Sequence, residues 1–521
     1  MIRRFGLVAG LALGAGLLSA QAPPPAPPAP PASPPTAPAN AGFGGGRELQ
    51  RLTGERFTEN CGGCHGAPGT VGRAPNLFDQ RLLSAHSDED LFRIVTKGIE
   101  GAEMPAFEEV LPTEQIWQLI AWLRLEAENT QPRPQFIADP AGAVIASEQQ
   151  KFRIDVVAQG LETPWGLAFL PDGRMLVTER AGQLRIIDRK GRLLPQAVKN
   201  TPLVWERQDA GLMDVAVDPD YRKTGWIYLS LVELKPGYQL PPAPALKPGE
   251  RPPNHPSMTV IVRGRLNKKG EWVDAQTLFS APLDRYTPSG VHYGSRLTFD
   301  PQGRLLFSMG ERGDMKNAQD LSTPLGKLHR INRDGSIPAD NPFVNRPGAV
   351  PSILSWGHRN PQGLAHDAVG RLWEAEHGPS GGDEINLIQP GGNFGWGVVS
   401  MGIQPGISTR AAPGMIGPVA YYTPTIAPSG IALYRGNRYP AWSGNLFVAG
   451  LAGQQLRRLV LDGERITHQE VLFKSYGRVR AVTTGPDGLL YVLLQRPTGQ
   501  GTGQPLSAST PGLVIKLEPL P

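Results

Sequence analysis

The run Gly166-Leu-Ala-Phe-Leu-Pro-Asp-Gly-Arg-Met-Leu-Val177 decides the fold, because the chain repeats its pattern. Close copies are Arg296-Leu-Thr-Phe-Asp-Pro-Gln-Gly-Arg-Leu-Leu-Phe307, Gly363-Leu-Ala-His-Asp-Ala-Val-Gly-Arg-Leu-Trp-Glu374 and Ala481-Val-Thr-Thr-Gly-Pro-Asp-Gly-Leu-Leu-Tyr-Val492, and looser copies start at Asp214 and Gly430. Each copy predicts a strand, a tight turn and a second strand. Six such units favour a mainly β fold, a six-bladed β-propeller over residues 151–521. A β-sandwich is the alternative, but a sandwich does not require one signature six times.

A different kind of segment, residues 47–128, precedes the repeats. It holds the only two cysteines of the chain, in the run Cys61-Gly-Gly-Cys64-His65. Two thiols at this spacing can form thioether bonds to the vinyl groups of a haem while the adjacent histidine binds the iron. The motif therefore predicts covalently bound haem c, a carrier of single electrons.

Met104 is the expected second ligand of the haem iron. It precedes Pro105 in a glycine-bounded loop, and a thioether ligand raises the haem potential; an ordinary core methionine is the alternative. Ser87 is expected to cap one helix, and apolar spacing predicts another from Thr113. The segment resembles the small class I cytochromes c, which implies a small all-α cytochrome c domain.

The remaining N-terminal segments predict export and spacing. Residues 1–22 read as a secretory signal peptide, with a basic start, an apolar stretch too short for a typical membrane span, and small residues after it; an uncleaved anchor is the alternative. The Pro- and Gly-rich residues 23–46 and the segment 129–150 read as linkers. We therefore expect a periplasmic or secreted protein with no transmembrane segment once the signal is removed.

Polar residues gather just before or after the strands of several repeats. His292 precedes the third repeat, Arg359 and Asn360 precede the fourth, and Arg478 and Arg480 precede the sixth. Equivalent places in the blades of a propeller converge on one face near the axis. A base, several cations and an oxygen-rich loop after the fourth repeat suit a polyanionic quinone held with a hard cation. The modest net charge of +5, with scattered Lys and Arg, gives no nucleic-acid footprint.

These strings resemble the soluble dehydrogenases that use pyrroloquinoline quinone (PQQ), the glucose/sorbosone dehydrogenase family. The resemblance covers about residues 152–519 and is most specific at Gly357-His-Arg-Asn-Pro-Gln-Gly-Leu364. It implies a calcium-containing, six-bladed propeller enzyme that oxidises an aldose sugar, or a related alcohol or aldehyde, at PQQ. With haem c in the same chain, the electrons are expected to pass to the haem and then to an external redox acceptor of the respiratory chain.

The resemblance also implies roles for single residues. His292 would be the general base, and Arg359 would stabilise charge on the quinone. The residues implied to bind the cofactor are Asn360, Arg478 and Arg480. The residues implied to bind calcium are Gly378 and Pro379, through main-chain carbonyls beside PQQ, and Glu384 and the carbonyl of Phe394 in a second, structural site.

Two positions depart from the family pattern. A glutamine that the family places near the quinone falls here on Asp209 or, in a shifted register, on Gln208, and a lysine in the fifth blade is replaced by Ala452. An acid beside an anionic cofactor is unfavourable, and a lost cation should weaken PQQ binding. An alternative is therefore a propeller that binds a protein or glycan without catalysis, beside a cytochrome c that acts as an electron relay or redox sensor. A lactonase-like calcium propeller is a third possibility.

Overall fold

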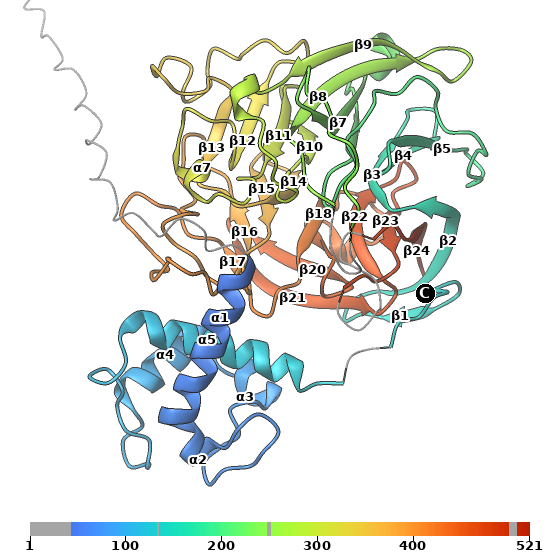
Figure 1. Ribbon diagram of the computed structural model, residues 1–521. Helices are drawn as coiled ribbons and strands as arrows, with labels where there is room; N and C mark the ends of the chain where they lie inside the picture. Colours follow the sequence, from blue (N-terminus) through green and yellow to red (C-terminus); the bar gives the residue numbers. More distant parts are fainter. Residues whose placement is uncertain (1–42, 133–134, 247–251, 500–507) are drawn as a thin grey trace, which may run out of the picture. The chain divides into compact units, whose positions relative to one another are not determined.

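The computed structural model describes residues 43–132, 135–246, 252–499 and 508–521 (Figure 1). The predicted signal peptide, residues 1–22, lies outside these ranges, as does most of the spacer predicted over residues 23–46. No helix within the described ranges has both the length and the apolar character needed to cross a bilayer.

The first part of the described chain is helical, as predicted. Its elements are α1 (Phe43–Phe57), η1 (Thr58–Gly62), α2 (Gly63–His65), α3 (Gln80–Ser84), α4 (Asp88–Lys97) and α5 (Thr113–Asn129). Because α1 begins at Phe43, the end of the predicted spacer is helical instead of extended. The core is built on α5, whose Ile120 and Trp122 are buried with Phe57 and Phe78.

Two helix starts were predicted correctly from their local sequence. Helix α5 begins at Thr113. Before α4, the hydroxyl of Ser87 accepts a hydrogen bond from the Asp90 main-chain N–H, and the Asp90 carboxylate accepts one from the Ser87 N–H. This reciprocal capping box satisfies donors that would otherwise have no partner at the helix start.

The second part forms six antiparallel sheets arranged as blades around an axis (Figure 1). Neighbouring innermost strands contact each other around a closed ring. These strands are β3 (Pro164–Phe169), β6 (Leu212–Val217), β10 (Leu297–Phe299), β14 (Pro361–His366), β18 (Pro428–Leu433) and β22 (Arg478–Thr484). The second strands are β4 (Met175–Glu179), β7 (Ile227–Leu234), β11 (Leu305–Met309), β15 (Leu372–Glu376), β19 (Leu446–Gly450) and β23 (Leu490–Gln495).

Each predicted repeat is one hairpin of an innermost and a second strand, so the six-bladed propeller is confirmed and the sandwich is excluded. The third strands are β5 (Gln183–Ile187), β8 (Ser257–Leu266), β12 (Lys327–Ile331), β16 (Asp383–Leu387), β20 (Gln455–Asp462) and β24 (Pro511–Pro519). The outer strands are β9 (Trp272–Phe279), β13 (Ile353–Trp356), β17 (Ala420–Tyr422), β21 (Arg465–Lys474) and β2 (Lys151–Glu162).

Ring closure depends on the sixth sheet, whose order is β1-β2-β24-β23-β22. Strand β2 comes before the first blade in the chain, yet it pairs with the last strand, β24. The short strand β1 (Val144–Ala146) pairs with β2, so the predicted linker 129–150 already contributes to the sheet at its C-terminal end.

Arg296 ties several blades together near the axis. Its guanidinium donates to Asp214 Oδ1 at 3.1 Å and to the carbonyl oxygen of Gln362 at 2.7 Å. Its Cζ lies 4.2 Å from the ring centre of Trp165. Asp214 also accepts the main-chain N–H of Leu297. These contacts connect the first four blades, and burial lowers the pKa of Arg296 and raises that of Asp214.

The capping box of α4 gives a test of local stability. Replacing Ser87 by alanine removes the side-chain half of the box, so the helical domain should lose about 1 kcal/mol of unfolding free energy. Ser87→Thr, which can still cap, should lose much less. Urea unfolding followed by the helical circular dichroism signal measures both, and equal stability of Ser87→Ala and wild type would contradict the expectation.

Candidate active site

His292 and Glu311 form a hydrogen-bonded pair in the third blade. His292 lies before β10, and Glu311 lies after β11. His292 Nδ1 lies 2.6 Å from Glu311 Oε1, and both side chains are almost fully buried. Burial would raise the pKa of Glu311, but His292 and Arg359 hold it below its usual value, so the carboxylate is ionised at neutral pH. An ionised acceptor requires that Nδ1 carries the proton, which makes Nε2 the basic nitrogen of the neutral ring. His292 also has φ of 55°, an uncommon conformation for a residue with a side chain.

Arg359 and Asn360 lie beside this pair. The main-chain N–H of Glu311 donates to the carbonyl of Arg359, and Asn360 Oδ1 accepts the N–H of Gly294, two residues after His292. Arg359 Nη1 donates to the carbonyl of His377 at 3.2 Å, and its Nε is buried with no partner in the described chain. Burial, and then the charge of Arg359, lowers the pKa of His377 well below its usual value.

Arg478 and Arg480, at the start of β22, bring two further cations to the same place. Arg480 Nη1 donates to Gln362 Oε1 at 3.1 Å. The Nε of each arginine is buried and has no hydrogen-bond partner among the described residues. Burial lowers the pKa of Arg478 to about 10. The pKa of Arg480 falls well below its usual value, because burial acts together with the like charge of Arg478.

The two positions that depart from the family pattern also lie near this site. Gln208 has φ of 54°, and its side-chain oxygen packs against Gly290 in the loop that leads to His292. Asp209 is exposed, and its charge opposes the lowering of the pKa of Arg478 and Arg480. The acid therefore offsets part of the positive charge instead of turning away from it. Ala452 is exposed and brings no cation.

The loop with Gly378 and Pro379 is held by Asp383, the first residue of β16. One carboxylate oxygen of Asp383 accepts the N–H of Gly378 at 2.8 Å. The other accepts the Thr425 hydroxyl and the Ile426 and Ala427 N–H groups at 2.6, 2.6 and 2.8 Å. Fixed main-chain carbonyls are ligands that Ca²⁺ accepts, so this loop fits the predicted calcium site beside the cofactor.

Half-buried Glu384 and buried Glu374 and Glu376 form a group of acids around Asn386. The Nδ2 group of Asn386 lies 3.0, 3.4 and 3.2 Å from carboxylate oxygens of Glu374, Glu376 and Glu384. Burial, and then the charge of Glu376, raises the pKa of Glu374 and Glu384 well above the usual value. A bound cation would relieve this repulsion, so the donor set fits the predicted second calcium site.

Phe394 lies next to this acidic group. Its ring stacks on His358 at 4.9 Å, and His358 Nδ1 lies 3.1 Å from Glu376 Oε1. Ligand atoms of His358, Glu374 and Glu376 lie within 4.8 Å of one another. His358 is fully buried between Ser355 and Glu376.

In the helical domain, a main-chain carbonyl holds one ring nitrogen of His65. Its Nδ1 lies 2.7 Å from the carbonyl oxygen of Pro75. A carbonyl only accepts, so Nδ1 is the protonated nitrogen and Nε2 presents its lone pair. Cys61 and Cys64 are not joined by a disulfide, as thioether attachment demands. These three residues fit a covalent haem.

Met104 lies in a tight turn after α4. The Ile99 N–H donates to the Met104 carbonyl, and at Gly98, with φ of 71°, a Cβ would lie 2.5 Å from the same oxygen. Only glycine permits this approach, so the local sequence fixes the turn that carries Met104. Its role as iron ligand stays a prediction.

Glu311, His377 and Asp383 were not singled out by the pattern of the sequence. Glu311 ends the hairpin of the third repeat, and a carboxylate at that position was a possible signal, because loops at equivalent blade ends converge. His377 and Asp383 lie inside the string that was recognised only for its carbonyls and Glu384. The contacts of these three residues join loops at the ends of different strands, which local spacing does not encode.

Comparison with known proteins agrees with this architecture. The family model "Glucose / Sorbosone dehydrogenase" matches residues 161–503, and the model "Cytochrome C oxidase, cbb3-type, subunit III" matches residues 51–123. Aldose sugar dehydrogenase YliI of Escherichia coli (strain K12) is 36% identical over 357 residues, which cover 67% of this chain and 91% of YliI.

Two solved structures resemble the propeller. The soluble aldose sugar dehydrogenase of Escherichia coli in its apo-form superposes with a TM-score of 0.62 and 32% identity, covering 71% of this chain and all of that one. The PQQ-bound aldose sugar dehydrogenase of Streptomyces coelicolor gives 0.54 and 29%, with the same coverage. The chain therefore belongs to the glucose/sorbosone dehydrogenase family and carries a cytochrome c domain before its propeller.

Proposed function

We propose that this protein is an exported quinohaemoprotein that oxidises an aldose sugar, or a related alcohol or aldehyde, with PQQ. Electrons pass to haem c in the domain at residues 47–128 and then to an external acceptor. A signal peptide over residues 1–22 would direct the chain out of the cytoplasm. Haem attachment to its Cys-Gly-Gly-Cys-His motif takes place outside the cytoplasm.

The observation that carries the proposal is the unbalanced positive charge at the axis. Arg478 and Arg480 are like charges that burial penalises, and each keeps a buried N–H without a partner in the described chain. Unpaired buried cations cost several kcal/mol, of order 3–5 when a partner is missing. An anionic ligand with carboxylates, which PQQ is, would satisfy them, and arginine suits bidentate contact with carboxylates.

The proton chemistry follows from the pair next to these cations. His292 accepts the proton of the sugar hydroxyl at Nε2, because Nδ1 is protonated and held by Glu311. The ionised Glu311 carboxylate stabilises the positive ring that results. When bound, PQQ would supply a carbonyl centre able to accept hydride from the sugar carbon that carries this hydroxyl.

Arg359 and Asn360 would hold the reacting end of the cofactor. Arg359 is fixed by its bond to the His377 carbonyl and by Trp396, whose ring centre lies 5.2 Å from its Cζ. A buried, preset cation stabilises negative charge that develops in the transition state without reorganising. Calcium at Gly378 and Pro379 would add a second positive charge there, and calcium at Glu384 and Phe394 would be structural.

The central test is reconstitution with Ca²⁺ and PQQ, which should give aldose-dependent reduction of an artificial dye and of the haem. Because a general base contributes roughly 100-fold or more, His292→Asn should lower dye reduction at least by that factor. His366→Asn is the matched control and should retain full activity, because His366 is at the end of β14 opposite to Asn360. Titration with PQQ should show unchanged affinity in both variants.

Two outcomes would contradict the assignment. A wild-type propeller that leaves the absorbance of added PQQ unchanged would favour the binding-module alternative. Full activity of His292→Asn would remove the proposed base even if PQQ binds.

The arginine pair gives a second prediction. Arg478→Gln and Arg480→Gln should each raise the Kd for PQQ at least about tenfold, because each loses a charge-assisted contact. Without PQQ, the Arg480→Gln protein should be no less stable than wild type, since it loses a buried like charge. Fluorescence titration and thermal unfolding measure these effects, with the exposed Arg465→Gln as control. Unchanged Kd in both variants would argue against the cofactor pose.

The acidic group around Asn386 gives a third prediction. Calcium at about 100 times its Kd should stabilise the wild-type protein by about 2.7 kcal/mol. Glu374→Gln and Glu384→Gln should weaken this calcium-dependent stabilisation, yet raise the melting temperature in chelator because they relieve repulsion. Calorimetry with calcium and with chelator measures both effects. A melting temperature that does not respond to calcium in wild type would exclude the structural site.

A further inference from the structure

The segment from Ser400 to Arg410, called here the 400–410 loop, packs against the loop proposed to hold calcium beside PQQ. The Ile403 N–H donates to the carbonyl of Ser380 at 3.1 Å, and Ser380 follows Pro379 directly. A Cβ at Gly402 would lie 2.2 Å from the carbonyl oxygen of Gly381. The backbones of the two loops are therefore in direct contact.

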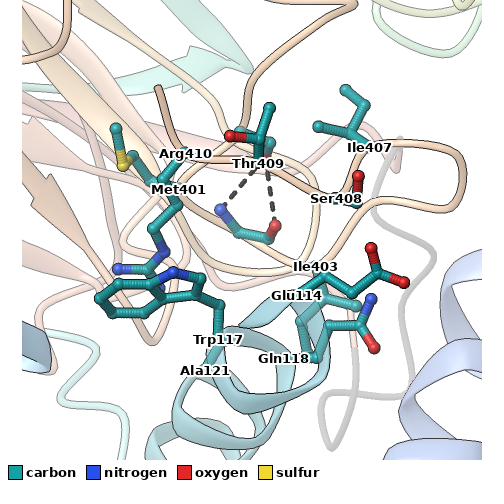
Figure 2. Close-up of a pocket in the computed structure, with 12 residues that line it drawn as sticks. Glu114, Trp117, Gln118, Ala121, Met401, Ile403, Ile407, Ser408, Thr409 and Arg410 are labelled. Atoms are coloured by element: carbon teal, nitrogen blue, oxygen red, sulfur yellow. Dashed lines mark hydrogen bonds between the residues drawn. The ribbon is translucent and has the colours of Figure 1, made fainter. Parts of the chain in front are cut away.

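The same loop also contacts the cytochrome c domain. Ile403 is 1% exposed and belongs to the hydrophobic core that α5 builds with Leu119 and Ile120. The Cζ of Arg410 lies 4.2 Å from the ring centre of Trp117. Figure 2 shows Trp117, Gln118 and Glu114 projecting from α5 toward the loop. A cavity of about 20 Å³, room for one water molecule, remains among these residues.

A buried charge cluster reinforces this contact. Asp88, at the start of α4, has a side chain that is 3% exposed. It accepts hydrogen bonds from Arg124 at 2.5 Å in its own domain, and from Arg410 and the Tyr421 hydroxyl of the propeller, each at 3.0 Å. Burial would raise the pKa of Asp88, but Arg124 and Arg410 hold it below its usual value. Separating the two surfaces would leave Arg410 and the Tyr421 hydroxyl without this partner.

Helix α1 of the cytochrome c domain also lies near the loop that contains Gly378 and Pro379. A Cβ at Gly46 would lie 3.6 Å from the Ser380 hydroxyl, which is ordinary contact distance. Ser380 thus lies near α1, and its carbonyl accepts the N–H of Ile403, whose side chain enters the core of the cytochrome c domain.

We propose that the 400–410 loop, with Tyr421, is a docking surface. It holds the cytochrome c domain against the loop that contains Gly378 and Pro379. Electrons then cross a preformed contact. Transfer does not depend on how often a tethered cytochrome c domain meets the propeller, a frequency that the segment 129–150 would set. This inference rests on the proposed function. Oxidation of one aldose to its lactone releases two electrons and two protons. Haem iron goes from Fe(III) to Fe(II) twice, and a one-electron acceptor such as ferricyanide reoxidises it each time.

The test uses the full haem-containing chain. Arg410→Ala removes the ion pair and the contact with Trp117, and loss of one partner of a buried charge contact lowers binding roughly 30-fold or more. Small-angle X-ray scattering should show a larger radius of gyration. In the PQQ- and Ca²⁺-loaded protein, aldose-driven haem reduction should slow by roughly that factor, while reduction of a dye that takes electrons at the propeller stays unchanged.

Matched variants separate docking from general damage. Arg93→Ala, on the exposed side of α4, should behave as wild type. Tyr421→Phe removes one hydroxyl from Asp88 and should give a smaller effect in the same direction if Arg410→Ala does not fold. A flexible insertion of about ten residues after Gln131 should leave haem reduction unchanged, because a docked domain does not depend on its tether.

Two results would overturn docking. One is an Arg410→Ala protein with the scattering curve and haem reduction rate of wild type. The other is haem reduction that slows on insertion after Gln131. If no aldose reduces the dye in wild type, the proposed function fails, but the scattering comparison still decides whether the two surfaces are docked.

Discussion

The buried ion pair between Arg296 and Asp214 is the constraint on which the propeller depends. No disulfide links the six sheets, so no covalent cross-link fixes the orientation of one blade relative to the next. Arg296 instead bonds the second and fourth blades and lies on the Trp165 ring of the first. Such a pair contributes little net stability, but breaking it is costly, so it selects one arrangement of blades over others.

The blade arrangement fixed in this way brings together polar and charged groups whose burial without partners is unfavourable. Arg359, Arg478 and Arg480 point unpaired N–H groups into the interior, and His292 adopts a strained backbone conformation. Apolar packing within and between the blades, together with antiparallel strand pairing, holds the ring and lets it tolerate this local cost. The same separation holds at Asn386, where three acids crowd one amide. The sites proposed for PQQ and calcium are thus places where the folded chain leaves charges or polar groups without partners.

The fold could be predicted because its signals are local. Six hairpins carry the same turn signature, Ser87 marks a helix start, and the haem motif spans five residues. His292, Arg359 and Asn360 could be singled out from strings beside the hairpins, and the structure places them close together. Glu311 and Asp383 could not, because their partners come from other loops and blades. Strand β1 was missed, since its pairing with β2 overrides a composition typical of linkers. The helical start at Phe43 was missed as well.

Closure of the sixth sheet imposes an order on biosynthesis. Strand β2 is among the first parts of the propeller to be made, but its neighbour β24 is made last. Until then the edge of β2 stays open, while the cytochrome c domain that precedes it can already form its helices. Exposed strand edges are the usual starting points of aggregation. Strand β2 therefore needs protection from other exposed strands until β24 has been made.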